Sequence, residues 1–494
     1  MSFVKQLAGQ TAIYGLSSIL SRVLHYILLT VYLTRVFAPV TYGIYTDLYA
    51  YTALLLIIFT FRMETAFFRF GAEPAQKDLA FSEAMVFIAI ISIALMSILI
   101  GFRDHIASAL TYTGKGRYVV YFACILALDA LAAIPFAKIR LDERPIRFAT
   151  IKILNILVTL VLVFLFLEGF PWLIDHGWNW LSNYYHEDLR LDLVFIANLI
   201  ASAVVWILLL PDMWTIKWKR SLGFRKKMLW YVIPLVIVGL AGVFNQSFAV
   251  PLLKYLLPGS NAENLQTAGL YAAAAKLALL MNLFTQAFNY AAEPFFFKSA
   301  ASQRAQEIYA EVAQAFALVA SIFLLGILLY LDLLVLILGP DYRESLHIVP
   351  ILLVAFWFLG MYYNISIWYK ILDKTHFGAL ISVGGSIITL LVVSAYISVY
   401  TDVAMAGATL ACYSFMCIAG YVIGRRYYPI PYPIVKIMGY LIMALLIYVL
   451  SKAIADGVQN LTTKLALNTI LLLAYIIAVY RFDRQTIQHW FARS

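Results

Sequence analysis

Three ionisable side chains lie near the middle of long apolar segments, where charges are rare. They are Arg22, Lys276 and Asp129. A charge at the centre of a bilayer costs about 2.5–3.5 kcal/mol on insertion scales, so such groups usually face a partner or a water-filled cavity. Two cations and one acid favour an anionic ligand such as a phosphate, because Arg can hold it through two hydrogen bonds while Lys acts as a point charge.

Further polar residues accompany these charges. His25 follows Arg22 by three residues, which places both on one helix face. A repeat set out below aligns Gln246 of a later apolar segment with Arg22. Structural pairing is the competing interpretation of Arg22, as an ion pair is of Asp129. The candidate substrate-binding residues in this group are Arg22, His25, Asp129, Asn245, Gln246 and Lys276.

A second set of charges lies where two apolar segments end. These charges could guide an anionic headgroup into a cavity, or they could be ordinary basic anchors of membrane helices. The predicted residues of this cytoplasmic mouth are Arg62, Glu64, Arg69, Glu293 and Lys298.

The elements that carry these residues are predicted to be membrane helices. Of the 494 residues, 63% are hydrophobic and 13% are charged, whereas soluble domains are about 45–50% apolar and about 25% charged. Apolar runs long enough for a helix to cross a bilayer recur along the chain. They predict an all-α polytopic protein with about fourteen spans, near 11–36, 43–62, 82–102, 117–138, 147–168, 191–211, 228–256, 267–290, 311–331, 346–369, 377–399, 403–424, 433–454 and 462–480.

The basic residues predict the orientation of these spans. Of 36 Lys and Arg residues, 25 lie on the side that holds both termini and nine lie on the other side. Basic loops stay in the cytoplasm, so we expect a multi-pass protein with both termini cytoplasmic. The net charge of +10 is then mainly topological, and no basic stripe on a soluble domain indicates nucleic acid as a partner.

An internal repeat predicts how the spans are grouped. Thr41-Tyr42-Gly43-Ile44-Tyr45 resembles Thr267-Ala268-Gly269-Leu270-Tyr271, and the segment 64–69 resembles 293–298. Each repeat would hold six spans, so both halves have the same orientation about an axis along the membrane normal, as in transporters with parallel repeats. We therefore predict lobes at 1–215 and 216–426, related by a pseudo-two-fold axis, followed by a helix pair at 427–494 after a Pro-rich break.

Motifs for soluble enzymatic chemistry are missing from the sequence. Thr113-Gly114-Lys115-Gly116 lacks the spacing of a phosphate-binding loop. The scattered His residues and the three Cys residues predict neither a metal site nor a cofactor site. We therefore expect a protein that is not an enzyme. An integral-membrane glycosyltransferase or polymerase is the rival from another class, although the predicted outside loops are short and carry no pair of carboxylates.

Several segments together resemble a known family. They are 15–22, 34–39 with Tyr42-Gly43, 64–69, Leu338-Gly339-Pro340-Asp341-Tyr342, Lys374-Thr375 and Gly407-Ala408. With them the whole chain resembles bacterial polysaccharide-biosynthesis flippases, which include the O-antigen and other lipid-linked oligosaccharide flippases of the multidrug/oligosaccharidyl-lipid/polysaccharide exporter superfamily. Ser21-Arg22-Val23-Leu24 is also similar to the start of the lipid II flippases of that superfamily, and Arg35 matches a basic position there. Leu28-Leu29 stand where those flippases carry an Arg-Asp pair, which counts against a peptidoglycan precursor.

The resemblance implies a substrate, a location and partners. It implies a flippase that moves undecaprenyl-diphosphate-linked oligosaccharide from the cytoplasmic to the periplasmic leaflet of the bacterial inner membrane, for surface polysaccharide or lipopolysaccharide synthesis. It adds Arg35 to the candidate substrate-binding residues, and membrane lipids and polysaccharide polymerase machinery as partners. No cofactor is implied, and membrane potential, protons or sodium could drive transport. A multidrug exporter of the same superfamily, coupled to cations, is the alternative.

Overall fold

The computed structural model describes residues 29–183, 185–214, 216–300, 302–372, 374–455 and 460–484. Within these ranges the chain forms helices and connecting turns, without strands. Twelve of the helices are long and apolar enough to cross a membrane. A helix suits this environment because it satisfies its backbone N–H and C=O groups within one segment. The prediction of an all-α polytopic membrane protein is confirmed.

The described helices match the predicted spans from 43–62 onward. Helix α18 (His376–Tyr427) has 52 residues and covers two predicted spans, 377–399 and 403–424. Its backbone leaves the helical conformation at Thr401, with φ 46° and ψ −117°. Most of the first predicted span, 11–36, lies outside the described residues, and only α2 (Thr30–Val36) represents its end.

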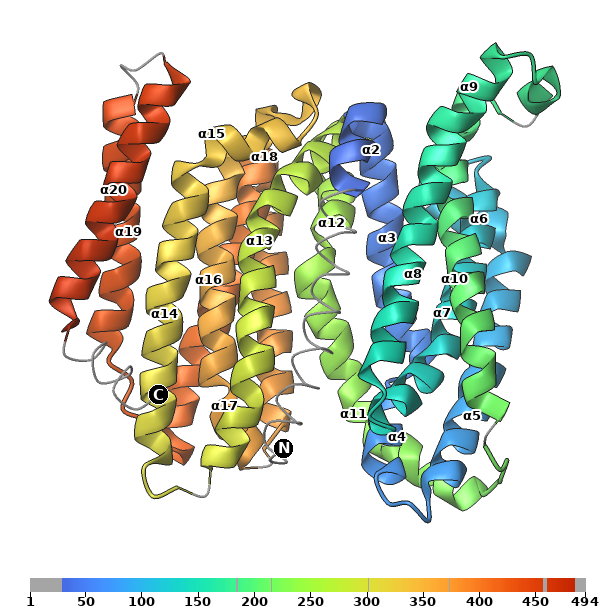
Figure 1. The fold of residues 1–494 in the computed structure, drawn as a ribbon, viewed down its shortest axis with the longest axis horizontal. Coiled ribbons are helices and arrows are strands. Elements are labelled where there is room, and N and C mark those ends of the chain that lie inside the picture. Colours follow the sequence, from blue (N-terminus) through green and yellow to red (C-terminus); the bar gives the residue numbers. More distant parts are fainter. Residues whose placement is uncertain are drawn as a thin grey trace. The chain divides into compact units, whose positions relative to one another are not determined.

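Contacts divide the chain into two compact units. Unit 1 includes Val40–Tyr255 and Gly259–Leu265. Figure 1 shows three of its long helices, α7, α8 and α10, side by side. The helices up to α12 are α3 (Pro39–Thr60), α4 (Met63–Gly71), α5 (Lys77–Gly101), α6 (Arg103–Ala109), α7 (Gly116–Leu141), α8 (Pro145–Phe164), α9 (Phe170–Asp175), α10 (Arg190–Trp214), α11 (Leu222–Ser247) and α12 (Ala249–Leu256).

Helix α11 belongs to unit 1 because a buried carboxylate and an apolar core attach it there. Glu83 of α5 accepts a hydrogen bond from Arg225 Nε at 2.6 Å and another from the backbone N–H of Ser221. Met228 of α11 packs in one core with Phe67 and with residues of α5 and α7. Unit 1 therefore extends past residue 215. The lobes 1–215 and 216–426 follow from the sequence repeat and not from contacts, and they stay a prediction.

Unit 2 contains Thr30–Pro39, Leu256–Pro258 and Gln266–Ser494. Helices α14, α16 and α18 pack in sequence, and α19 and α20 pack on α14 (Figure 1). Asp483 after α20 joins this group, since Lys436 Nζ lies 2.6 Å from its carboxylate and Gln314 donates to it. The helices are α13 (Asn261–Ser299), α14 (Ala305–Leu329), α15 (Leu331–Leu334), α16 (Val349–Ile365), α17 (Ile367–Ile371), α18, α19 (Ile434–Ala455) and α20 (Leu461–Phe482).

Candidate functional site

A cavity of about 430 Å³ opens among five helices of unit 1, namely α3, α4, α7, α8 and α10. We call it the basic cavity. Asp129 and Arg140, both on α7, lie about 16 Å apart along the helix axis, taking about 1.5 Å per residue. The cavity therefore reaches from the end of α7 to near its middle. Its polar lining residues are Thr60, Arg62, Glu64, Asp129, Arg140, Lys152, Asn155, Asn198 and Ser202.

The charges of this lining are unequal. The cations are Arg62, Arg140 and Lys152, and the acids are Glu64 and Asp129. Arg62 Nη1 lies 3.8 Å from Glu64 Oε1, a loose pair that leaves guanidinium donors available. With one positive charge in excess among its lining side chains, the cavity can hold an anion such as a phosphate group.

Two of the cations lie over aromatic rings. The Arg140 guanidinium carbon is 4.9 Å from the centroid of the Phe68 ring. Lys152 Nζ is 4.2 Å from the centroid of Phe136. A ring face attracts a cation electrostatically without neutralising it. Both cations are thereby held within a partly apolar lining of the cavity.

Asp129 lies where three of these helices meet. It accepts a hydrogen bond from Ser202 of α10, and Lys152 of α8 acts on it as the nearby positive charge. A single polar group on an isolated apolar helix would be costly in the membrane. Here Ser202 and Lys152, which line the same cavity, offset part of the cost of burying the Asp129 carboxylate.

An interruption of the helical backbone conformation places Arg62 in the cavity. Phe61 (φ 48°) and Arg62 (φ 54°) both adopt the left-handed conformation between the end of α3 and the start of α4. Residues other than Gly pay about 1–3 kcal/mol for such conformations, which often occur at functional sites. The break bends the chain, so that Arg62 lines the cavity together with Asp129 and Lys152.

Gly239 of α11 gives Arg62 the space that it occupies. A Cβ atom at Gly239 would lie 2.7 Å from both Nε and Nη2 of Arg62. That distance is well inside van der Waals contact, so a side chain at this position would require the Arg62 guanidinium to shift. By contrast, a Cβ atom at Gly242, one turn further on, would meet nothing within 4 Å.

The structure brings together some of the predicted site residues. Arg62, Glu64 and Asp129 line the basic cavity. Arg22 and His25 lie outside the described residues. Lys276 is half-buried on α13 and belongs to unit 2. The roles predicted for Arg22, His25 and Lys276 stay predictions.

The other predicted residues lie elsewhere in their units. Asn245 and Gln246 are near the end of α11, which stops at Ser247, and they do not line the basic cavity. Arg35 at the end of α2 donates to the backbone C=O of Leu336 at 3.2 Å. This contact connects α2 to the turn after α15, and the predicted substrate role of Arg35 is untested by it.

Some of the residues predicted to form the cytoplasmic mouth line the basic cavity, and others do not. Arg69 does not line the basic cavity, and its guanidinium carbon lies 4.5 Å from the centroid of the Tyr231 ring. The backbone of Glu293 and Lys298 belongs to the last turns of α13, while their side chains lie outside the described part. Of the three mouth residues whose side chains the structure describes, Arg62 and Glu64 line the cavity and Arg69 does not.

Sequence reasoning missed several lining residues. Arg140 and Lys152 were counted as basic anchors of a cytoplasmic loop, and the structure instead places them on α7 and α8 facing the cavity. The spacing of polar residues along the sequence could have indicated these lining positions. Lys152 and Asn155 are three residues apart, and Asn198 and Ser202 are four apart, so each pair forms a polar stripe on one face of an otherwise apolar helix.

A second cluster in unit 1 is fully buried. Lys254 of α12 and Asp47 of α3 form an ion pair at 2.7 Å, and both side chains are 0% exposed. The Tyr112 hydroxyl donates to the same carboxylate oxygen at 2.5 Å, and Lys254 Nζ also donates to the Leu110 carbonyl at 2.6 Å. Burial raises the pKa of the Tyr112 phenol, and the Asp47 charge raises it further, so the phenol stays protonated and donates.

Comparison with known proteins identifies the fold. The structure titled "Lipid II flippase MurJ, inward closed conformation" matches with a TM-score of 0.74 at 13% sequence identity, covering 96% of this chain and 99% of that one. A MATE structure in complex with MaD3S matches with a TM-score of 0.61 at 10% identity, covering 87% of this chain and 96% of that one. A mutant of the Vibrio cholerae MATE transporter VcmN matches with a TM-score of 0.57 at 14% identity, covering 85% and 96%.

These matches concern the fold alone, because the identities are far below those of close relatives. No protein-family profile matches the chain, and the search of curated proteins finds no match. The chain therefore has the fold shared by a lipid II flippase and by MATE transporters, and it is a multi-pass membrane protein.

Proposed function

We propose that this protein is a flippase that moves a lipid-linked oligosaccharide diphosphate across the bacterial inner membrane. The observation that carries the proposal is the basic cavity, where Arg62, Arg140 and Lys152 line a pocket that extends into the membrane-spanning part of unit 1. A diphosphate needs several cations around it, while its sugars need only polar neighbours. Asn155 and Asn198 supply such amide groups.

The mechanism follows from the chemistry of such a substrate. The diphosphate binds to the cations, the sugars occupy the aqueous part of the cavity, and the polyprenyl tail stays in the lipid. Alternating access between two lobes then exposes the headgroup first to the cytoplasm and later to the periplasm. Arg22 and Lys276 stay predicted contacts of the diphosphate, since each lies near the middle of a predicted span.

A membrane potential can drive the step. Outward movement of a negative charge gains about 2.3 kcal/mol per 100 mV when the cytoplasm is negative. No ATP is consumed in this proposal, and proton or sodium coupling would act through an acid such as Asp129. Polysaccharide polymerase machinery would receive the product on the periplasmic side. Both termini are cytoplasmic in the proposed orientation, because the larger set of basic residues lies on that side.

Two alternatives have observations of their own. The MATE matches make the fold compatible with a cation-coupled multidrug exporter. A cationic drug, however, would meet an excess of positive charge in the basic cavity. The lipid II flippase match supports a peptidoglycan precursor as substrate. Against it, Leu28-Leu29 stand where lipid II flippases resembling this chain carry an Arg-Asp pair.

Complementation tests the proposal in cells. A strain lacking its own O-antigen flippase, expressing this chain and supplied with suitable sugars, should regain surface polysaccharide. The variants Arg140→Gln and Lys152→Gln, and also Arg22→Ala and Lys276→Ala, should lose most of it at unchanged membrane protein levels. Arg103→Gln is the matched control, because Arg103 is exposed and lies outside the cavity. Export at the wild-type level in all four variants would exclude the charged cavity as the binding site.

A further inference from the structure

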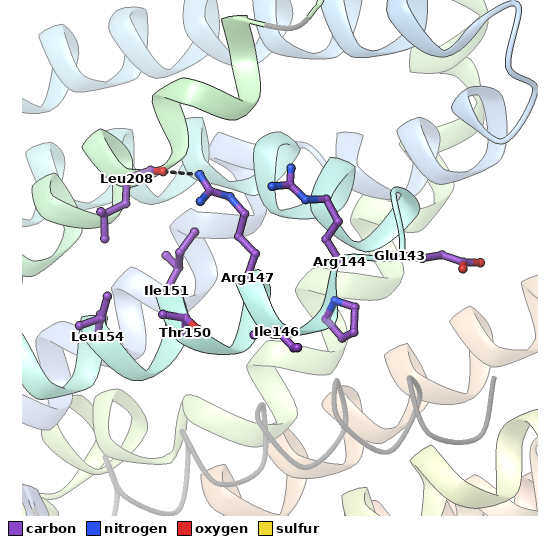
Figure 2. Close-up of a pocket in the computed structure, with 9 residues that line it drawn as sticks. Glu143, Arg144, Ile146, Arg147, Thr150, Ile151, Leu154 and Leu208 are labelled. Carbon is purple, nitrogen blue, oxygen red and sulfur yellow. Dashed lines mark hydrogen bonds between the residues drawn. The ribbon is translucent and has the colours of Figure 1, made fainter. Parts of the chain in front are cut away.

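A second pocket, separate from the basic cavity, lies in unit 1 where α8 begins. Its volume is about 630 Å³, and its lining comes from the start of α8 with Leu208 of α10 (Figure 2). We call it the interfacial groove. Its lining residues are Glu143, Arg144, Pro145, Ile146, Arg147, Thr150, Ile151, Leu154 and Leu208.

The interfacial groove and the basic cavity use different faces of α8. Phe148, Lys152 and Asn155 line the cavity, whereas Arg147, Ile151 and Leu154 line the groove. Each residue of the second set precedes one of the first set by a single position. One position rotates a helix by about 100°, so the two pockets open on separate sides of α8.

The head of the groove is positively charged. Arg144 Nη1 lies 2.7 Å and Arg147 Nη2 lies 2.6 Å from the carboxylate of Asp212, whose side chain is 3% exposed. Arg147 Nη2 also donates to the Leu208 carbonyl at 3.0 Å (Figure 2). One buried carboxylate thus orients two guanidinium groups and neutralises only one of them.

Glu143 also lines the groove, and its side chain points away from both guanidinium groups in Figure 2. Each guanidinium has five N–H donors, and the bonds to Asp212 and Leu208 leave donors of both groups for a ligand. The start of α8, with Pro145 in its first turn, adds the positive end of the helix dipole.

The rest of the groove is apolar and continues along the helix. Ile146 is 74% exposed, and the exposed side chains of Leu154, Leu157, Val161 and Phe164 follow on α8. Their spacing of three or four residues forms one stripe along the helix. In a membrane protein, such a stripe of exposed aliphatic side chains faces the hydrocarbon of the lipid.

We propose that the interfacial groove binds the phosphate headgroup of an anionic phospholipid, whose acyl chains lie along the stripe on α8. Arg144 and Arg147 bind the phosphate, and Thr150 and Ile151 contact the glycerol region. Two basic side chains between helices, directly above apolar surface, are the arrangement that recognises an acidic lipid in its own leaflet. This site is independent of the transported substrate, since its residues do not line the basic cavity.

The test measures lipid binding to the purified full-length protein in detergent, by native mass spectrometry and by the shift in melting temperature. The probes are phosphatidylglycerol, phosphatidylcholine and inorganic phosphate. Phosphatidylglycerol should bind with a clear preference and raise the melting temperature. The affinity for phosphatidylcholine should be lower by a factor of about ten or more, because its headgroup is zwitterionic. Inorganic phosphate should give little shift, since it cannot use the apolar stripe.

Three variants locate the binding. The triple variant Arg144→Gln, Arg147→Gln, Asp212→Asn removes the charges without leaving the buried carboxylate unpaired, and it should lose the preference for phosphatidylglycerol. Thr150→Trp fills the groove at an exposed position and keeps both arginines, and it should also weaken binding. Arg103→Gln removes an exposed arginine elsewhere in unit 1 and should bind like the wild type.

The opposite results overturn the proposal. Equal binding of phosphatidylglycerol and phosphatidylcholine would mean that the arginines do not select an anionic headgroup. An equal thermal shift with inorganic phosphate would mean that no lipid chain is involved. Unchanged phosphatidylglycerol binding in both the triple variant and Thr150→Trp would place the lipid elsewhere.

Discussion

At the residue scale, the pair formed by Lys254 and Asp47 is fully buried in unit 1. Tyr112 donates a further hydrogen bond to Asp47, and Lys254 donates one to the Leu110 carbonyl. Such a pair contributes little against an apolar replacement of both partners, but loss of one partner leaves a buried charge unpaired. The cluster joins α3, α12 and the segment before α7 within the unit.

The first prediction concerns this pair. Lys254→Met should destabilise the protein by about 3–5 kcal/mol, because the Asp47 carboxylate is then left without a cation. The double variant Lys254→Met, Asp47→Leu should recover a large part of that loss. Thermal unfolding in detergent measures both variants. Lys464→Met, which removes one partner of the partly exposed pair with Asp332, should cost less than about 1 kcal/mol. Equal effects of Lys254→Met and Lys464→Met would contradict the assignment.

A second prediction rests on the space around Arg62. Gly239→Ala would put a methyl group 2.7 Å from the guanidinium, so the Arg62 guanidinium must shift from the position that it holds. We expect loss of export with little loss of fold, because alanine itself favours a helix by about 1 kcal/mol over glycine. Gly242→Ala, at a position with open space, is the control and should export normally. The account fails if both variants export equally well.

A third prediction concerns Asp142, which lies just beyond the end of α7. Burial alone would raise the pKa of this carboxyl, but the hydrogen bonds from Lys77 and Lys138 outweigh burial and hold its pKa below the ordinary value of 3.8. A depressed folded-state pKa stabilises the fold above the unfolded pKa, and this contribution disappears as the pH falls below 3.8 toward the folded value.

Asp142→Asn should therefore lower stability at neutral pH and flatten its dependence on pH below about 4. The melting temperature of both proteins between about pH 3 and about pH 7 gives the measurement. Parallel pH profiles for the wild type and the variant would show that the Lys77 and Lys138 contacts do not stabilise the fold.

At the scale of the elements, breaks in helices position the side chains that matter. The left-handed residues Phe61 and Arg62 separate α3 from α4 and bring a guanidinium into the basic cavity. Thr401 interrupts α18 between two spans. Both breaks lie at non-glycine residues, so their strain is maintained by the surrounding packing.

Thr401 gives the prediction for this scale. Its φ of 46° and ψ of −117° suit glycine, which has no Cβ atom to clash with the backbone. Thr401→Gly should keep or raise stability by about 1 kcal/mol, whereas Thr401→Val should lower it by a similar amount. Thermal unfolding of the two variants side by side measures the difference. A more stable Thr401→Val variant would mean that the strained backbone has relaxed in the protein.

The sequence predicted helices better than the breaks in them. Hydropathy locates spans because a bilayer demands about 20 apolar residues for each crossing, and the polar pair Thr401-Asp402 marks the boundary inside α18. Nothing local marks Phe61 and Arg62 as left-handed, because that conformation depends on packing around them. Lys152 was missed since a basic residue near a helix end looks like an anchor until the cavity beside it is known.

At the scale of the whole molecule, twelve helices in the described part of the chain are long and apolar enough to cross a membrane, and the fold is shared with a lipid II flippase and MATE transporters. The two compact units are defined by contacts between residues, whereas the predicted lobes are defined by the sequence repeat. The fold leaves the substrate open, because proteins of this fold differ in what they carry. The charges of the basic cavity are what make a diphosphate substrate the favoured proposal.

Reconstitution tests the central claim most directly. The purified protein in liposomes should expose a fluorescent undecaprenyl-diphosphate oligosaccharide to an outside quencher much faster than empty liposomes do. The double variant Arg140→Gln, Lys152→Gln should fall to near the protein-free rate, and an uncharged polyprenyl lipid should not be moved. Transport of a cationic dye instead, or equal movement of the oligosaccharide lipid by the wild type and the double variant, would contradict the account.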